Sequence, residues 1–346
     1  MKTDSETPAG IDTPAVARWL TEHVNEASPP FTLNQIAGGE SNLTFHVVDA
    51  DEHEWILRRP PLGTLKATAH DMLREAHVMS GLAATAVSVP EVLARCDDPA
   101  VTGAPFYVMR FVSGLVLRTA GEMDQSIAVE RRARACELLV EALAAVHAAD
   151  PDACGLGDLG RRDGYVERQL ARWRKQIDGL EVPRIHDVIA LHERLNASVP
   201  SPSKRATLIH GDFRFDNAVV SATGDVRAIL DWELATLGEP LADLAITLAA
   251  WSGPGEVMGF GQQGPTSAPG CLTLDEAAAH YARSSGREVV HLHWYLAWAS
   301  WRIASILCGV YARRRSGAQG DSAGYTLAEY AAEISRRIDI ATSWLT

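Results

Sequence analysis

The chain has 346 residues, a net charge of −12 and five cysteines. This length predicts two domains, or one with a lobe boundary, and a core that needs no disulfide or metal. The 44 acidic residues outnumber the 32 Lys and Arg, which argues against binding to nucleic acid. Widely spaced cysteines favour free thiols, and neither a signal segment nor a stretch of membrane-spanning length is present. We therefore expect a cytosolic protein without a membrane partner.

The first part of the chain alternates between strand and helix signals. Val16, Leu20 and Val24 are four residues apart and predict a helix over residues 12–26. Strands are expected over residues 31–39, 41–50, 54–61, 87–98 and 104–114, with a helix over 69–83 between them. Residues 1–112 therefore predict an antiparallel sheet that carries one helix.

From about residue 125 the pattern becomes helical. Cys136, Leu139, Leu143 and Val146 recur at spacings of three and four, which is typical of one buried helix face. Helical patterns continue over residues 163–196 and beyond Pro240, and a hairpin is expected over 218–230. The sequence thus predicts an α+β fold with a β-rich lobe, residues 1–112, and a larger helical lobe, residues 113–346.

The segment most informative about chemistry is His-Gly-Asp-Phe-Arg-Phe-Asp-Asn at residues 210–217. Phosphoryl transfer from ATP needs a carboxylate that accepts the proton of the attacking hydroxyl, and oxygen ligands for Mg²⁺. The spacing H-x-D-x-x-x-x-N supplies both from one loop through Asp212 and Asn217, and Asp231 returns after the hairpin as a second metal ligand. Loop carboxylates also cap turns, but the two segments together favour kinase chemistry.

These segments resemble the aminoglycoside phosphotransferase and choline kinase family, small-molecule kinases with a protein-kinase-like two-lobe fold. The resemblance runs from about residue 31 to 315, and HGDFRFDN, ILDWE and GEPLADLA are most similar to a branch found in bacteria and attached to eukaryotic acyl-CoA dehydrogenases. It implies a catalytic loop at 210–217 with Asp212 as the base. It also implies a metal hairpin at 218–233, with Asn217 and Asp231 as the ligands of Mg²⁺.

Three more residues near the loop follow from this resemblance. Arg214 falls where protein kinases place a lysine near the transferred phosphoryl group. His210 is expected to brace the loop rather than to act as a base. Asp243 matches a carboxylate that hydrogen-bonds the catalytic loop in kinase-like folds, although an acid at a helix N-terminus explains it equally well.

The resemblance places the nucleotide against the first lobe. Arg58 stands where the strand lysine of kinases lies, and Glu75 where the helix glutamate pairs with it. Arginine keeps the charge and can bind phosphate through two donors, but its geometry differs. Strand alternation turns Arg59 to the opposite face, and Lys66 remains a second candidate phosphate ligand.

Backbone groups complete the expected nucleotide site. Gly38 and Gly39 replace the longer glycine motif of kinases, and amides near Ser41 and Asn42 would approach the phosphates, although a glycine pair between strands is also an ordinary turn. Residues 108–114 resemble the kinase hinge, so the backbone of Arg110 and Val112 would face the adenine.

Substrate choice is assigned to helices within residues 241–346. From residue 251 onward the chain has eight acidic residues, eight arginines and eleven of its 23 aromatic residues. Polycationic antibiotics need an acidic pocket, so this balance favours a neutral or anionic, partly apolar alcohol. Trp294, Trp298 and Trp301 share one helix face, which core packing explains more often than ligand binding.

The sequence therefore predicts an ATP- and Mg²⁺-dependent kinase that transfers the γ-phosphate to a hydroxyl of a small molecule. One alternative is a nucleotide-binding pseudokinase that regulates a partner, suggested by Arg58 and the short glycine loop. Another is a true aminoglycoside O-phosphotransferase. Because Asp212, Asn217 and Asp231 are all present, the enzyme is favoured over the pseudokinase. The sequence names neither the acceptor nor an oligomeric state.

Overall fold

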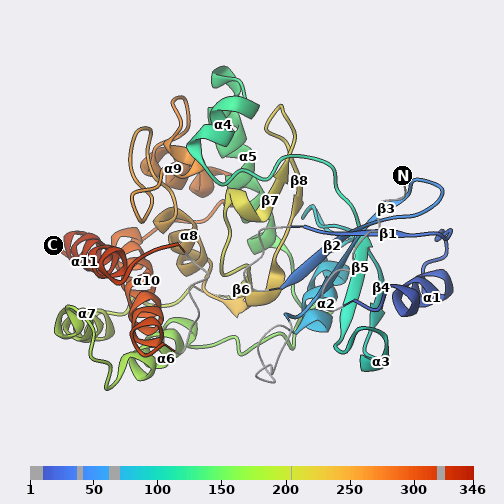
Figure 1. Cartoon of the computed structure of the whole chain (residues 1–346). Coiled ribbons are helices and arrows are strands. Elements are labelled where there is room, and N and C mark those ends of the chain that lie inside the picture. Colours follow the sequence, from blue (N-terminus) through green and yellow to red (C-terminus); the bar gives the residue numbers. More distant parts are fainter. Residues whose placement is uncertain (1–10, 37–41, 62–70, 204, 318–323) are drawn as a thin grey trace. The chain divides into compact units, whose positions relative to one another are not determined.

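The computed structural model describes residues 11–36, 42–61, 71–203, 205–317 and 324–346 (Figure 1). The chain forms two compact units. Unit 1 comprises Met1–Ser113 together with Arg227–Ala235, and unit 2 comprises Gly114–Val226 together with Thr236–Thr346. In the described part of the chain, no helix is both long and apolar enough to cross a lipid bilayer.

Unit 1 is built on an antiparallel sheet of five strands in the order β1-β2-β3-β5-β4. The strands are β1 (Thr32–Gln35), β2 (Leu43–Val48), β3 (Glu54–Arg59), β4 (Val92–Cys96) and β5 (Phe106–Arg110). The helices before β5 are α1 (Thr13–His23), α2 (Met72–Leu82) and the single turn α3 (Pro99–Thr102). The predicted sheet and its helix are confirmed, whereas α3, which is capped by Asp98, was not predicted.

Alternation along β3 sorts its side chains between two faces. Trp55 and Leu57 are fully buried and pack with Phe45, Phe106 and Leu20 of α1 in the core of unit 1. Arg58 lies on the other face and is opposite Thr44 of β2 and Tyr107 of β5. The sheet thus presents Arg58 on the side away from its apolar core.

The segment Arg227–Ala235 differs from the sequence prediction, which placed it in the lobe of residues 113–346. It contains most of β8 (Val226–Ile229) and the 3-10 helix η2 (Trp232–Leu234). Its backbone bonds to unit 1, because the Ile229 amide donates to the Ser88 carbonyl at 2.8 Å and the Arg74 side chain donates to the Ala235 carbonyl at 2.5 Å. These bonds bring Asp231 into the same unit as Arg58.

Unit 2 is mainly helical, as predicted. Its helices are α4 (Ala120–Ser126), α5 (Val129–Ala148), α6 (Tyr165–Ile177), α7 (Ile185–Ala197), α8 (Pro240–Ala249), α9 (Leu274–Ser285), α10 (Leu292–Arg315) and α11 (Leu327–Trp344). The predicted stripe on α5 is buried: Cys136, Leu139, Leu143 and Val146 are at most 1% exposed. The small antiparallel sheet with the larger helical unit confirms the expected α+β fold class.

Short strands carry the functional loop of unit 2. The strands β6 (Thr207–Ile209) and β9 (Thr236–Gly238) pair antiparallel, and β6 leads directly into residues 210–217. Next come the 3-10 helix η1 (Phe215–Asn217) and β7 (Ala218–Val220). The Ser221 amide donates to the Asp225 carbonyl at 2.9 Å and closes the turn of the predicted hairpin.

The three tryptophans of α10 are core residues. Trp298 and Trp301 are fully buried and Trp294 is 8% exposed. The indole of Trp301 donates to the Val188 carbonyl at 2.9 Å, and that of Trp294 donates to the Ser198 hydroxyl at 3.1 Å. The spacing that marked one helix face therefore reflects core packing, with Trp301 against α7, Trp294 against Ser198 and Trp298 beside Tyr165 of α6.

Candidate active site

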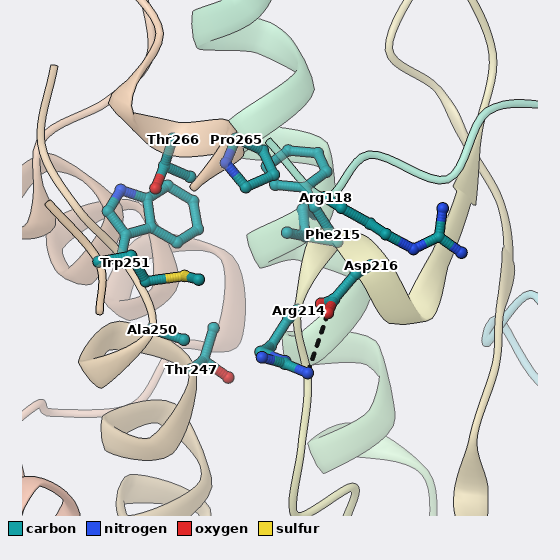
Figure 2. Close-up of a pocket in the computed structure, with 11 residues that line it drawn as sticks. Arg118, Arg214, Phe215, Asp216, Thr247, Ala250, Trp251, Pro265 and Thr266 are labelled. Carbon is teal, nitrogen blue, oxygen red and sulfur yellow. Dashed lines mark ion pairs between the residues drawn. The ribbon is translucent and has the colours of Figure 1, made fainter. Parts of the chain in front are cut away.

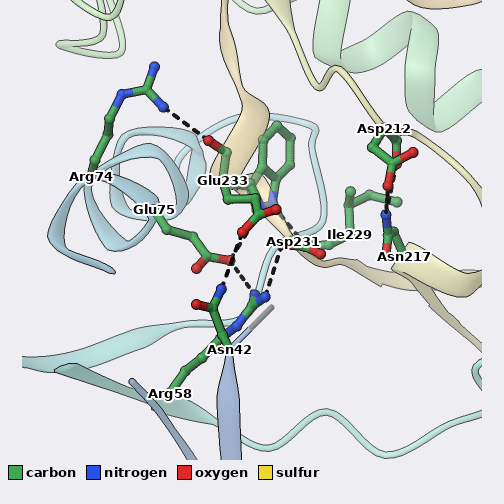
Figure 3. A network of polar contacts seen from close by, with 10 residues as sticks. Asn42, Arg58, Arg74, Glu75, Asp212, Asn217, Ile229, Asp231 and Glu233 are labelled. Atoms are coloured by element: carbon green, nitrogen blue, oxygen red, sulfur yellow. Dashed lines mark hydrogen bonds and ion pairs between the residues drawn. The ribbon is translucent and has the colours of Figure 1, made fainter. Parts of the chain in front are cut away.

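The loop after β6 brings the expected base and one expected metal ligand together (Figure 3). The Asn217 side-chain nitrogen donates to the Asp212 carbonyl at 2.8 Å and to its carboxylate at 3.1 Å. Gly211 has a φ of +86°, a left-handed conformation that glycine adopts readily, so the chain turns sharply just before Asp212. Because Asn217 uses its nitrogen toward Asp212, its amide oxygen is left for another partner.

Arg214 lies between two carboxylates of the same loop. Its Nε is 3.3 Å from Asp212 Oδ1, and its Nη2 is 2.9 Å from Asp216 Oδ2. Burial raises the pKa of Asp216, an effect that the positive charge of Arg214 partly offsets. Asp216 was not among the predicted site residues, although an acid two residues after Arg214 was a visible signal.

A buried carboxylate supports the loop from below. Asp243, in the first turn of α8, is fully buried and accepts hydrogen bonds from the amides of His210 and Gly211, both at 2.8 Å. Burial alone would raise the pKa of Asp243, but hydrogen bonds from His147 and the His210 amide lower it overall. This geometry supports the loop-bracing interpretation of Asp243 over that of an acid merely placed at a helix N-terminus.

His210 is also part of this support. Its side chain is fully buried, and its Nδ1 accepts a hydrogen bond from the Asp212 amide at 3.3 Å. A ring held in this way is turned inward, in agreement with the expectation that His210 braces the loop.

In unit 1, Arg58 contacts two carboxylates (Figure 3). Its Nη1 pairs with Glu75 Oε1, and its Nη2 is 2.9 Å from Asp231 Oδ1. Burial lowers the pKa of Arg58, but the charges of Glu75 and Asp231 outweigh this effect and raise it overall. Burial raises the pKa of Glu75 to about 7, although Arg58 opposes the shift. The structure thus contains the expected Arg58–Glu75 pair and adds Asp231 to it.

Asp231 itself adopts an unusual backbone conformation. Its φ is +64°, which residues other than glycine adopt rarely and which recurs at functional sites. Its side chain does not cap η2, which starts immediately afterwards. Turn capping, the alternative explanation for this carboxylate, is therefore not what it does here.

Further polar residues of unit 1 join this network. The side chain of Asn42 is buried and donates to Glu233 Oε2 at 3.3 Å, while Arg74 donates to the Glu233 carbonyl at 3.4 Å. Asn42 was predicted to contribute only its backbone, and Glu233 was not predicted at all, even though it stands two residues after Asp231. Ser41 and Lys66 lie outside the described residues.

The expected hinge residues lie at the end of β5. The Arg110 amide donates to the Glu91 carbonyl at 2.9 Å, so this amide is engaged within unit 1, and the side chain pairs with Glu26 and Glu91, both at 2.9 Å. For Val112, no backbone hydrogen bond is found within the described ranges. Arg59 donates to the Thr102 carbonyl at 2.6 Å, on the opposite side of β3 from Arg58, as alternation predicts.

A small cavity, partly open to solvent, lies beside Arg214 and Asp216 in unit 2 (Figure 2). Arg118 lines the same cavity and attracts the Asp216 carboxylate. The remaining walls are mostly apolar and comprise Leu139, Phe215, Thr247, Ala250, Trp251, Met258, Pro265 and Thr266. The substrate was predicted to bind helices within residues 241–346, which supply only part of this lining, and neither Arg118 nor Trp251 was among the predicted residues.

One wall of this cavity is fixed by the C-terminal helix. The Met258 carbonyl accepts hydrogen bonds from Arg336 and from Arg337, the latter at 2.8 Å. Glu333 pairs with both arginines at 2.7 Å. We refer to Glu333, Arg336 and Arg337 as the arginine clamp. It attaches the glycine-rich segment 252–270 to α11.

A small antiparallel sheet with a buried Arg–Glu pair, and a helical unit with an Asp–Asn loop after a short strand, define the protein-kinase-like class of phosphotransferases. The chain belongs to the phosphotransferase enzyme family, whose model matches residues 32–266. It is 33% identical over 340 residues to chicken acyl-CoA dehydrogenase family member 11, covering 94% of this chain and 43% of that protein. The chain thus spans less than half the length of this curated relative.

Solved structures agree with this assignment. A candidate aminoglycoside phosphotransferase from Ralstonia eutropha superposes with a TM-score of 0.80 and 30% identity, covering 96% of this chain and 98% of that one. Choline kinase from Cryptosporidium parvum gives 0.67 with 12% identity, covering 96% of each chain. Spectinomycin phosphotransferase, solved with ADP and spectinomycin, gives 0.62 with 11% identity, covering 98% and 99%. The last two likenesses show the fold alone.

Proposed function

We propose that this protein is an ATP- and Mg²⁺-dependent kinase that transfers the γ-phosphate to a hydroxyl group of a small molecule. The observation that carries the proposal is the contact of Asn217 with the Asp212 carboxylate, at 3.1 Å, on a loop held by Asp243. Family membership supports phosphoryl transfer as the reaction class.

Asp212 is the general base. Its side chain is 38% exposed, so an acceptor hydroxyl can reach it, while Asn217 orients it through the hydrogen bond just described. As the acceptor oxygen bonds to the γ-phosphorus, its proton passes to the carboxylate and the bond to the β-phosphate oxygen breaks. Arg214, beside the base, supplies positive charge toward the transferred group.

Asn217 and Asp231 are the proposed magnesium ligands. Mg²⁺ prefers oxygen donors, and these residues fit it, because Asn217 has its amide oxygen free of Asp212 and Asp231 is a partly exposed carboxylate that caps no helix. Held by Asn217 and Asp231, the metal would supply positive charge to offset the negative charge that develops during phosphoryl transfer.

The nucleotide phosphates are assigned to Arg58, with Glu75 orienting it, and to backbone groups near Ser41 and Asn42. The buried pairing of Arg58 with Glu75 supports this assignment, because a guanidinium held by a carboxylate keeps a fixed direction. Because the Arg110 amide is bonded to the Glu91 carbonyl, the backbone of Val112 is the expected hinge group that we assign to the adenine.

The cavity beside Arg214 and Asp216 is the proposed acceptor site. It combines two arginines and one aspartate with walls that include Trp251 and Met258. This charge balance suits a neutral or anionic, partly apolar alcohol and does not suit a polycationic antibiotic. The aminoglycoside alternative is therefore not favoured, and intact Asp212, Asn217 and Asp231 argue against a pseudokinase.

A nucleotide-consumption screen tests the proposal. ATP and Mg²⁺ would be incubated with hydroxylated metabolites, hydroxyl-bearing acyl-CoAs and aminoglycosides, with Asp212→Asn as the matched control. We expect ADP release with an apolar alcohol in the wild type and not in the control. Turnover that persists in Asp212→Asn would refute the role of the base, and turnover with aminoglycosides alone would refute the acceptor class.

A further inference from the structure

A line of buried hydrogen bonds runs from α9 to the catalytic loop. The Tyr281 hydroxyl is 2.6 Å from His147 Nδ1, and His147 Nε2 is 3.0 Å from Asp243 Oδ2. Tyr281 and Asp243 are fully buried, and His147 is 1% exposed. Asp243 in turn holds the amides of His210 and Gly211, directly before Asp212.

The chemistry of these groups fixes where the protons lie. Asp243 keeps its charge because hydrogen bonds lower its pKa despite burial, so it can only accept. His147 Nε2 must therefore donate to it. Burial raises the pKa of Tyr281, so the phenol keeps its proton and has it available for His147 Nδ1, 2.6 Å away. A Tyr281 hydroxyl that donates to Nδ1 would favour the histidine tautomer in which Nε2 donates to Asp243.

We propose that Tyr281 and His147 are positioning residues for phosphoryl transfer. They hold the Asp243 carboxylate, which holds the backbone of His210 and Gly211 and thereby the place of Asp212. Neither residue touches the reacting groups. The inference rests on the proposed function only for its catalytic consequence, because the bracing of the loop can be measured without any reaction.

Loss of the Tyr281 hydroxyl is expected to weaken the hydrogen bonds at the catalytic loop. In Tyr281→Phe, the Nδ1 lone pair of His147 would be buried without a donor, which favours ring rotation or entry of water. Asp243 would then lose a fixed partner, and the amides that it holds would open more often. A residue that only fills space would instead lower stability without selecting these two amides.

Amide hydrogen exchange of the full chain tests this expectation, with Tyr295→Phe as the matched control. Tyr295 is also buried in unit 2, at 2% exposure, and its hydroxyl has no hydrogen-bond partner in the part of the chain that the structure describes. We expect Tyr281→Phe to speed exchange at His210 and Gly211 by about tenfold relative to the control, after scaling to the amides of α10. Equal exchange in the two variants would overturn the proposal.

A second pair of variants tests the middle of the line. Glutamine offers an amide nitrogen that donates and an oxygen that accepts, so His147→Gln preserves both hydrogen bonds. His147→Leu preserves neither. We expect exchange near the wild-type rate in the first and faster exchange in the second, and no difference between them would contradict the mechanism.

A measurement on the unaltered chain decides the matter if a variant fails to fold. The ¹⁵N shifts of the His147 ring are expected to show a protonated Nε2 and an unprotonated Nδ1. A ring protonated only on Nδ1 would overturn the proposal.

The catalytic consequence has its own readout. ATP hydrolysis with water as the acceptor is expected to slow by about 3- to 10-fold in Tyr281→Phe, with an unchanged KM for ATP. The single variant His147→Gln is expected to hydrolyse ATP at close to the wild-type rate. A raised KM with unchanged kcat would contradict the positioning role. If the wild type transfers phosphate to no acceptor, including water, the proposed function fails while the exchange result still stands.

Discussion

Glu75 allows a thermodynamic test of the network around Arg58. Burial raises its pKa from the ordinary 4.5 to about 7, because Arg58 only partly offsets the loss of water and the repulsion of Asp231 and Glu233. Between these pH values the folded chain holds a proton that the unfolded chain has released. The free energy of unfolding therefore falls as the pH rises through this window.

The size of the effect follows from the same two values. Each pKa unit corresponds to about 1.36 kcal/mol, so titration of Glu75 lowers the free energy of unfolding by about 3 kcal/mol between pH 4.5 and pH 7. Glu75→Gln keeps the shape and cannot titrate. From pH 4.5 to pH 7, the free energy of unfolding of the wild type should therefore fall by about 3 kcal/mol relative to that of Glu75→Gln.

Urea unfolding at several pH values measures this difference directly. Glu26→Gln is the control, because a hydrogen bond from Arg110 lowers the pKa of Glu26 and its pH dependence has the opposite sign. Carboxyl ¹³C NMR provides a second measurement, in which one glutamate should titrate near pH 7 in the wild type and disappear in Glu75→Gln. Parallel stability curves for Glu75→Gln and the wild type would refute the reasoning.

Three further predictions concern the proposed reaction. Asp212→Asn should lower kcat by about 10²–10⁴-fold and leave Mg·ATP affinity unchanged in titration calorimetry, whereas half the wild-type turnover would exclude Asp212 as the base. Asp231→Ala should weaken ATP binding in the presence of Mg²⁺, and an unchanged metal-dependent affinity would move the metal site elsewhere. Arg58→Lys should raise the KM for ATP and Arg58→Ala should raise it further, with Lys66→Ala nearly silent; the reverse order would show that the alignment of β3 is wrong.

The features that the sequence predicted depend on residues close together in the chain. Asp212 and Asn217 are five residues apart on one loop, and the alternation that separates Arg58 from Arg59 lies within one strand. The pairing of Arg58 with Glu75 followed from the family resemblance. Short-range patterns and family motifs can both be recognised in a single sequence, and these features were therefore predictable.

The features that were missed depend on contacts between distant residues. Asn42 meets Glu233 across 191 positions, and Arg118 shares a cavity with Trp251. The sequence around each of these residues does not indicate which distant residue it will contact. The tryptophans of α10 show a related limit, because the same spacing is produced by a core face and by a binding face.

The arginine clamp has a consequence for how this cavity can diversify. Arg336 and Arg337 hold the carbonyl of Met258, and every residue type carries the same main-chain carbonyl. The side chain at position 258 can therefore change while the hydrogen bonds to its carbonyl still hold this part of the cavity wall in place. Evolution, or a library of variants at this position, can reshape the cavity while the loop that carries Asp212 keeps its sequence and its chemistry.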